Sequence, residues 1–168
     1  MRRNDVDEVI LLVTQQKHGS LIPIFMKEIH ILLVEDNEGD IVLTMEALED
    51  ARVQNKVTVK KDGAVALDYL ADLAAQSPED LPDLILLDIN LPKIDGKEVL
   101  NYIKKDEQLK KIPVVMLTTS SSQQDILESY NGHANCYITK PVDINKFFNI
   151  VKVIEDFWIT IVKLPSKQ

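Results

Sequence analysis

Short, almost continuously apolar runs alternate along this chain with amphipathic segments from residue 29 onward. Three of the runs, residues 31–34, 84–87 and 114–117, are apolar at every position. A strand that is apolar on both faces is typical of a parallel sheet that is covered on both sides. With two less regular runs, the pattern predicts strands at residues 29–34, 57–60, 84–87, 112–117 and 134–138.

The segments between these runs show the spacing of amphipathic helices. In residues 38–52, for example, Ile41, Met45 and Leu48 recur at positions i, i+4 and i+7. Ser121-Ser122 and Asp143 are candidate N-caps for two later segments, because their side chains can accept hydrogen bonds from free backbone N–H groups. The pattern predicts helices at residues 38–52, 63–74, 95–105, 121–131 and 143–162.

Five strands that are each followed by a helix predict an α/β fold, a (βα)5 doubly wound parallel sheet. Right-handed crossover connections place helices on both faces of such a sheet. Functional sites in these sheets form beyond the carboxyl ends of the strands, where the strand order switches. The residues that directly follow each predicted strand are therefore the first candidates for a site.

Polar residues follow four of the five predicted strands. Glu35 and Asp36 come after the first, Asp88 after the third, Thr118 after the fourth and Lys140 after the fifth. Each has a structural explanation: an Asp after a strand often forms a turn or a helix N-cap, a Thr can cap, and a Lys can lie solvated in a loop. Their coincidence at neighbouring strand ends favours one shared site.

The chemistry of these residue types points to phosphoryl transfer. Three clustered carboxylates repel one another unless a proton or a cation relieves them, and oxygen ligands without His or Cys suit Mg²⁺. A carboxylate is ionised at neutral pH and can attack phosphorus without a general base. Mg²⁺ and Lys140 can neutralise the charge of the phosphoryl group, and the Thr118 hydroxyl can donate to one of its oxygens.

Composition limits the partners and the compartment. The formal net charge of −8 and the lack of a long basic run argue against nucleic-acid binding. No apolar run approaches the ~20 residues of a membrane span. Cys136 is the only cysteine, which excludes an internal disulfide and agrees with a cytoplasmic location. Cys136, His30 and His133 lack partners at metal-ligand spacing, so we expect them to be structural.

Several stretches together resemble a known family, the receiver domains typified by the chemotaxis regulator CheY, over residues 28–162. The stretches that carry the resemblance are residues 31–37, 83–96, 113–118 and 137–141. Within that family the chain is similar to the small phytochrome-associated single-domain response regulators, in residues 35–40, 91–100, 135–140 and 157–158. The resemblance implies a flavodoxin-like fold with strand order 2-1-3-4-5.

The resemblance also implies a metal and phosphoryl site. Asp88 would be the phosphoacceptor, and Asp36 and Asp88 would bind Mg²⁺ together with the backbone carbonyl of Asn90. Glu35 would act on the metal through water. Lys140 would pair with the phosphoryl group.

A conformational switch is implied as well. Thr118 would report the phosphoryl group, and Tyr137 would be the aromatic residue that turns inward when Thr118 moves. The Lys140–Pro141 peptide bond would be cis, and Gly96 would support the turn after the third strand.

The implied function is that of a response regulator in two-component signalling, a phosphoacceptor rather than an enzyme with a separate substrate. It would assist its own Mg²⁺-dependent phosphorylation and dephosphorylation. The implied partner is a sensor histidine kinase, the phytochrome type included, or a histidine phosphotransfer protein. The output would pass through protein–protein interaction or a phosphorelay.

Three other interpretations compete. A phosphatase of the haloacid dehalogenase type would need a second Asp two positions after Asp88, where this chain has Asn90. A flavodoxin-type electron carrier would bind its cofactor phosphate where Glu35 and Asp36 repel it. The third is a receiver fold that has lost phosphorylation and acts only as an adaptor.

The domain boundaries and the last helix complete the predictions. We expect a receiver domain at residues 27–162, an N-terminal extension at 1–26 and a tail at 163–168. Either translation starts at Met26, or the extension is a loosely ordered leader, or it forms an extra packed helix near residues 5–17.

The last predicted helix carries more apolar residues than one buried stripe needs. Six of them share the spacing of a face toward the sheet: Ile144, Phe147, Val151, Ile154, Trp158 and Ile161. The remaining apolar surface predicts a homodimer with Phe148 and Phe157 as anchors, and residues 121–131 and the fifth strand contributing. Alternatively, the leader or the tail covers that surface.

Overall fold

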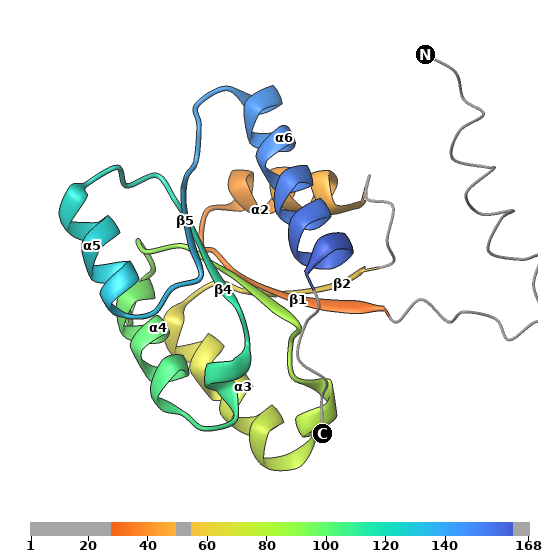
Figure 1. The fold of residues 1–168 in the computed structure, drawn as a ribbon, viewed down its shortest axis with the longest axis vertical. Coiled ribbons are helices and arrows are strands. Elements are labelled where there is room, and N and C mark those ends of the chain that lie inside the picture. The colour runs from red at the N-terminus through yellow and green to blue at the C-terminus, as the bar shows by residue number, and fades with distance from the viewer. Residues whose placement is uncertain (1–27, 50–54, 163–168) are drawn as a thin grey trace, which may run out of the picture.

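The computed structural model describes residues 28–49 and 55–162, which form one five-stranded parallel sheet flanked by helices (Figure 1). The strands are β1 (Ile29–Val34), β2 (Asn55–Lys60), β3 (Leu84–Leu87), β4 (Val114–Thr118) and β5 (Cys136–Thr139). The helices are α2 (Glu38–Glu49), α3 (Gly63–Gln76), α4 (Gly96–Lys105), α5 (Gln123–Asn131) and α6 (Ile144–Glu155). The strand order β2-β1-β3-β4-β5 confirms the predicted fold.

The described residues also form three short helical segments, two in connections and one directly after α6. They are the 3₁₀ helices η1 (Pro78–Asp80) and η2 (Leu109–Lys111) and the π-helical turn η3 (Asp156–Ile161). The predicted extension at 1–26, the tail at 163–168 and the end of the predicted helix at 50–52 lie outside the described residues. The fifth strand begins at Cys136 instead of residue 134, because Ala134 and Asn135 still belong to the connection from α5.

Both faces of the sheet are buried, as the continuous apolar runs predicted. Helices α2 and α6 cover one face, and α3 and α4 cover the other, with α5 beside α4 (Figure 1). Successive residues of a strand point to opposite faces, so Ile31 and Leu33 pack under α2 and α6, whereas Leu32 and Val34 pack under α3 and α4. Burying such a side chain stabilises the fold by about 1.5–3 kcal/mol, which fixes the register of the central strands.

N-caps fix the residues at which the loops after β4 and β5 end and the next helices begin. Ser122 caps α5 and Asp143 caps α6, as predicted, by accepting hydrogen bonds from the backbone N–H groups of Asp125 (3.4 Å) and Lys146 (2.9 Å). Each such cap stabilises its helix by about 1 kcal/mol. The caps therefore set the lengths of the loops at the carboxyl edge of the sheet.

Gly96 fixes the loop after β3, as the resemblance implied. A Cβ atom at this position would lie 1.9 Å from the backbone carbonyl oxygen of Asp88, so no other residue fits without moving the backbone. The backbone N–H of Gly96 donates to Ile89 (2.9 Å). On the far side of the loop, Lys93 has a φ of 66° and forms an ion pair with Asp62 (2.6 Å). The backbone that carries Asp88 is thus held from two directions.

The last helix differs from its prediction at both ends. Phe147, Val151 and Ile154 are buried against the sheet as predicted, but Ile144 is 56% exposed. Ile144 is the first residue of α6, directly after the N-cap Asp143. At the other end, regular α-helix stops at Glu155, and η3 continues with a hydrogen bond from Val162 N–H to the Phe157 carbonyl (2.9 Å).

Candidate functional site

Lys140 lies at the centre of a buried ionic cluster at the carboxyl edge of the sheet. Its backbone N–H donates to the Thr118 carbonyl (2.7 Å), which extends the pairing of β4 with β5 by one residue. Its ammonium group, 4% exposed, pairs with Glu35, with Asp40 Oδ2 (2.9 Å) and with Asp88 Oδ2 (2.9 Å). A lysine ammonium has three N–H donors, and here each faces a different carboxylate.

Two of these carboxylates stand at the ends of neighbouring strands. The backbone N–H of Glu35 donates to the Lys60 carbonyl, and that of Asp88 donates to the Val34 carbonyl, both at 3.0 Å. These bonds continue the parallel sheet and bring the two side chains together, and both are buried. The predicted convergence of Glu35, Asp88 and Lys140 is therefore observed.

The Asp88 carboxylate is stabilised in its ionised form. Burial alone would raise its pKa, but hydrogen bonding by the Thr118 hydroxyl and the charge and hydrogen bond of Lys140 outweigh burial and hold the pKa below its usual range. The backbone N–H of Asn90 donates to Asp88 Oδ1 (3.2 Å). Asp88 is thus a buried anion at neutral pH, which is the state required of a carboxylate nucleophile.

Glu35 and Lys140 show the opposing effects of burial and pairing. Burial raises the pKa of Glu35 to about 6, although the hydrogen bond and charge of Lys140 act to lower it. Burial also acts to lower the pKa of Lys140, but the hydrogen bonds to Glu35 and Asp40 raise it above its usual value. Lys140 is therefore a permanent cation in a cluster that carries excess negative charge.

Thr118 and Tyr137 are connected through Ser120. Thr118 is fully buried, and its Oγ1 accepts a hydrogen bond from the Ser120 N–H (3.3 Å). The Tyr137 hydroxyl donates to the Ser120 carbonyl (2.9 Å), and its ring packs against the core under α3 and α4. The two predicted switch residues therefore share one neighbour on the loop after β4.

Asp36 does not join the cluster as expected, and a carboxylate with no predicted role takes that place. Asp36 is exposed, and the third carboxylate on Lys140 is Asp40, in the first turn of α2. Asp40 does not directly follow a strand, so the rule that places sites at strand ends did not indicate it. The signal was present: α2 begins four residues after β1 ends, so its first turn faces the same edge of the sheet.

The oxygen donors at this edge fit a divalent cation of the Mg²⁺ type in their chemistry. Glu35, Asp36 and Asp88 supply carboxylates, and Asn90 supplies a backbone carbonyl. Within residues 28–49 and 55–162, however, no three His, Cys, Asp or Glu side chains are already arranged around a common metal position. Two of the carboxylates, Glu35 and Asp88, are turned toward Lys140.

The expected cis bond is absent. No cis peptide bond occurs among the described residues, so the Lys140–Pro141 bond is trans. A proline lowers the preference for trans but does not reverse it, and the prediction was wrong here.

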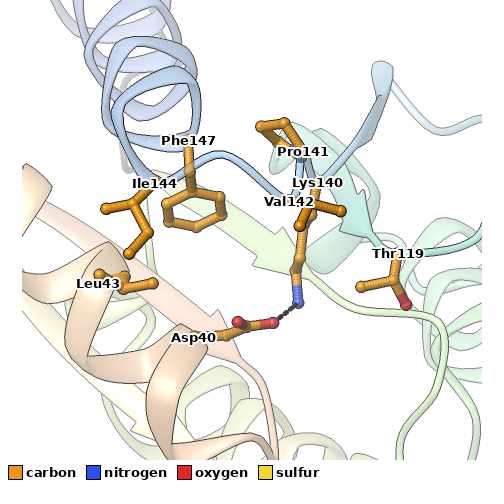
Figure 2. Close-up of a pocket in the computed structure, with 8 residues that line it drawn as sticks. All are labelled: Asp40, Leu43, Thr119, Lys140, Pro141, Val142, Ile144 and Phe147. Carbon is orange, nitrogen blue, oxygen red and sulfur yellow. Dashed lines mark hydrogen bonds and ion pairs between the residues drawn. The ribbon is translucent and has the colours of Figure 1, made fainter.

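A pocket of about 210 Å³ opens beside Lys140, between α2 and the start of α6 (Figure 2). Its residues are Asp40, Leu43, Thr119, Lys140, Pro141, Val142, Ile144 and Phe147. Figure 2 shows the Asp40 carboxylate facing the Lys140 ammonium at one end, with Thr119 and five apolar side chains around the rest. The ionic cluster is therefore reached from an apolar surface.

Comparison with known proteins identifies the family. The model of the response regulator receiver domain matches residues 31–152, most of the chain. This chain belongs to the response regulator receiver family. The response regulator Rcp1 of Synechocystis sp. is 43% identical over 136 residues, which are 81% of this chain and 92% of Rcp1. The phosphatase and flavodoxin interpretations are thereby set aside.

Solved receiver structures agree with the fold. The phosphorylated cyanobacterial phytochrome response regulator RcpA superimposes with a TM-score of 0.79 at 49% identity, covering 83% of this chain and 100% of RcpA. The Mn²⁺-bound form of Rcp1 gives a TM-score of 0.76 at 43% identity, covering 82% and 99%. The predicted similarity to phytochrome-associated response regulators is confirmed. In the part of the chain that the structure describes, no helix has the length and apolar character needed to cross a membrane.

Proposed function

We propose that Asp88 accepts a phosphoryl group from a histidine kinase or a histidine phosphotransfer protein. The observation that carries this proposal is the ionised Asp88 carboxylate, buried at the carboxyl edge of the sheet, with the Lys140 ammonium 2.9 Å from Oδ2. An anion that is already ionised and positioned beside a cation needs only a phosphoryl group in line with it.

The transfer balances without a general base. An Asp88 carboxylate oxygen forms a bond to phosphorus while the bond from phosphorus to the donor imidazole nitrogen breaks, and the imidazole keeps the electron pair. Lys140 neutralises the phosphoryl oxygens, and the Thr118 hydroxyl turns from the carboxylate to one of them. Hydrolysis of the acyl phosphate by water returns the free carboxylate.

Asp36, Asp88 and the backbone carbonyl of Asn90 would hold Mg²⁺, with Glu35 acting through water. When bound, the ion supplies positive charge to phosphoryl oxygens that one lysine cannot neutralise alone. The Mn²⁺-bound form of Rcp1 supports a divalent cation in this family. The exposure of Asp36 also suits this role, because its carboxylate is not engaged with Lys140.

The switch would pass from Thr118 to Tyr137. When the Thr118 hydroxyl moves toward the phosphoryl group, its hydrogen bond with Ser120 changes, and Ser120 is the residue that holds the Tyr137 hydroxyl. The Tyr137 ring already exchanges between an outward and an inward position, and the equilibrium then shifts toward the inward one. Beryllofluoride with Mg²⁺ should shift the NMR signals of Tyr137 in the wild type. Equal shifts in Thr118→Ala would disprove the coupling.

The partner that fits best is a cytoplasmic histidine kinase of the phytochrome type. RcpA is a phytochrome response regulator, and it is 49% identical to this chain. Such a chain signals by binding another protein or by passing the phosphoryl group on.

A homodimer through the last helix remains part of the proposal. Val153 and Phe157 are 65% and 47% exposed on α6 and η3, which supports an interface there. Phe148 is partly buried and packs against the sheet core, so Phe157 is the better anchor of the two predicted. The interface would extend to α5 and β5, as predicted from the sequence.

Light scattering tests the dimer. The wild type should be dimeric at high concentration, and Phe157→Glu together with Val153→Glu should be monomeric. A wild type that stays monomeric with and without beryllofluoride would end the dimer hypothesis.

Intact mass spectrometry tests the phosphoacceptor. Incubation with acetyl phosphate and Mg²⁺ should add one phosphoryl group to the wild type and none to Asp88→Asn. The adduct should not form in EDTA. An adduct of equal yield on Asp88→Asn would contradict the assignment.

A further inference from the structure

The three carboxylates that pair with Lys140 are not equivalent. The Glu35 and Asp88 side chains are 3% and 7% exposed, whereas that of Asp40 is 29% exposed. A buried carboxylate that loses its partner pays the full cost of lost solvation, but a partly exposed one exchanges its partner for water. Asp40 is therefore the partner that Lys140 can release at the lowest cost.

The backbone of Asp40 is fixed, so only its side chain is free to respond. Its N–H donates to Asn37 Oδ1 (3.1 Å), and its carbonyl accepts from the Thr44 hydroxyl (2.7 Å). Figure 2 shows its carboxylate facing the Lys140 ammonium, with both residues lining the pocket. A rotation of this one side chain would free an N–H of Lys140 without moving α2.

All three donors of Lys140 are occupied before transfer, and this creates a competition. Phosphorylation converts the Asp88 carboxylate into a neutral acyl group, so the N–H that faces Asp88 passes to the phosphoryl oxygens, while the other two N–H groups still face Glu35 and Asp40. A second N–H can reach a phosphoryl oxygen only if Glu35 or Asp40 gives it up, and a carboxylate that remains nearby repels the incoming group.

We infer that Asp40 is a positioning residue that holds one N–H of Lys140 in the unphosphorylated state and yields it to a phosphoryl oxygen. Its negative charge opposes phosphorylation and keeps the resting state favoured. This inference rests on the proposed function of Asp88.

The variant Asp40→Asn isolates the charge, because the amide oxygen still accepts a hydrogen bond and the side chain keeps its size. Asp40→Asn should bind beryllofluoride in Mg²⁺ about tenfold more tightly than the wild type, the size expected of one partly exposed like charge near the site. It should also accept phosphoryl groups from acetyl phosphate faster by a similar factor. Asp40→Glu should return both values toward those of the wild type.

Glu38→Gln is the matched control. Glu38 lies in the same first turn of α2 as Asp40, and the substitution removes the same negative charge. Glu38, however, pairs with Lys61, and its side chain is 72% exposed. It should leave beryllofluoride affinity and phosphorylation rate within about twofold of the wild type, as expected for a screened surface charge.

A second readout needs neither metal nor phosphoryl group. In EDTA, the Lys140 side-chain Nζ signal should shift in Asp40→Asn and stay unchanged in Glu38→Gln. Asp40→Asn values equal to those of Glu38→Gln, or a weaker affinity for beryllofluoride, would overturn the role of Asp40. A wild type that neither binds beryllofluoride nor forms an adduct would instead refute the proposed function, and the role of Asp40 with it.

Discussion

Two lysines of this domain each pair with several carboxylates, and their surroundings make them different. Lys97, on α4, pairs with Asp125 (3.0 Å) and Glu128 (2.7 Å) on α5, and its side chain is 30% exposed. Lys140 pairs with three carboxylates, and its side chain is 4% exposed. Water screens the first cluster and not the second.

The difference separates a structural cluster from a chemical one. The Lys97 cluster joins two adjacent helices, and losing it would leave solvated charges. The Lys140 cluster has more negative than positive charge in a buried place, which is unfavourable for stability and favourable for receiving a cation and a phosphoryl group. Burial and charge imbalance, and not the number of ion pairs, mark the functional site.

Removing each lysine should show the largest contrast between the clusters. Lys140→Met leaves buried carboxylates without a counter-ion and should lower the free energy of unfolding by about 3 kcal/mol. Lys97→Met, of matched size, should lower it by less than about 1 kcal/mol. Urea unfolding in EDTA measures both. Equal losses would mean that the Lys140 cluster is screened as the surface cluster is.

The clusters should also respond to pH in opposite directions. The pKa of Glu35, about 6 in the folded state, lies above its ordinary value of 4.5, so the contribution of Glu35 to stability is full below pH 4.5 and is lost as pH rises to about 6. The pKa of Asp125 is lowered, first by its hydrogen bond from Ser120, so its contribution is present above its ordinary pKa of 3.8 and is lost as pH falls.

Paired variants measure these contributions. The stability of the wild type relative to Glu35→Gln should fall by up to about 2 kcal/mol between pH 4.5 and 6, since one pKa unit corresponds to about 1.4 kcal/mol. The stability of the wild type relative to Asp125→Asn should fall by a smaller amount as pH is lowered below about 4. A wild type that gains stability relative to Glu35→Gln over the first range would mean that pairing with Lys140 outweighs burial.

Removing one carboxylate should affect Mg²⁺ binding at the Asp88 site but not at the Lys97 cluster. Asp36→Ala should weaken Mg²⁺ binding by about tenfold, because it removes a carboxylate ligand. Asp125→Ala removes the same charge from the surface cluster and should leave Mg²⁺ affinity within about twofold. Titration followed by intrinsic fluorescence or NMR compares the two. An unchanged Mg²⁺ affinity in Asp36→Ala would remove Asp36 from the proposed ligands.

The sequence predicted most of the fold because the apolar runs of β1, β3 and β4 admit only a sheet covered on both faces. It also located Glu35, Asp88 and Lys140, since the carboxyl ends of parallel strands meet at one edge. The strand ends alone do not indicate Asp40, because its position depends on which way the first turn of α2 faces, although the predicted start of that helix at residue 38 was correct.

The remaining differences have equally local causes. Ile144 is exposed although it shares the helical spacing of the buried residues. Helical periodicity predicts on which face a residue lies, but it does not predict at which residue the buried part of that face begins. The change from α-helix to the π-helical turn η3 at Asp156 is not visible in the spacing of apolar residues, which continues across it. The geometry of the Lys140–Pro141 bond depends on its packing and not on the dipeptide alone.

The most direct test locates the phosphoryl group on the chain. The wild type is phosphorylated with acetyl phosphate and Mg²⁺ and then treated with borohydride, which reduces an acyl phosphate to an alcohol. Tandem mass spectrometry of its peptides should show residue 88 converted from aspartate to homoserine, with Glu35, Asp36 and Asp40 unchanged. Conversion at one of those three residues in place of Asp88, or no conversion in a protein that carries the adduct, would contradict the role of Asp88.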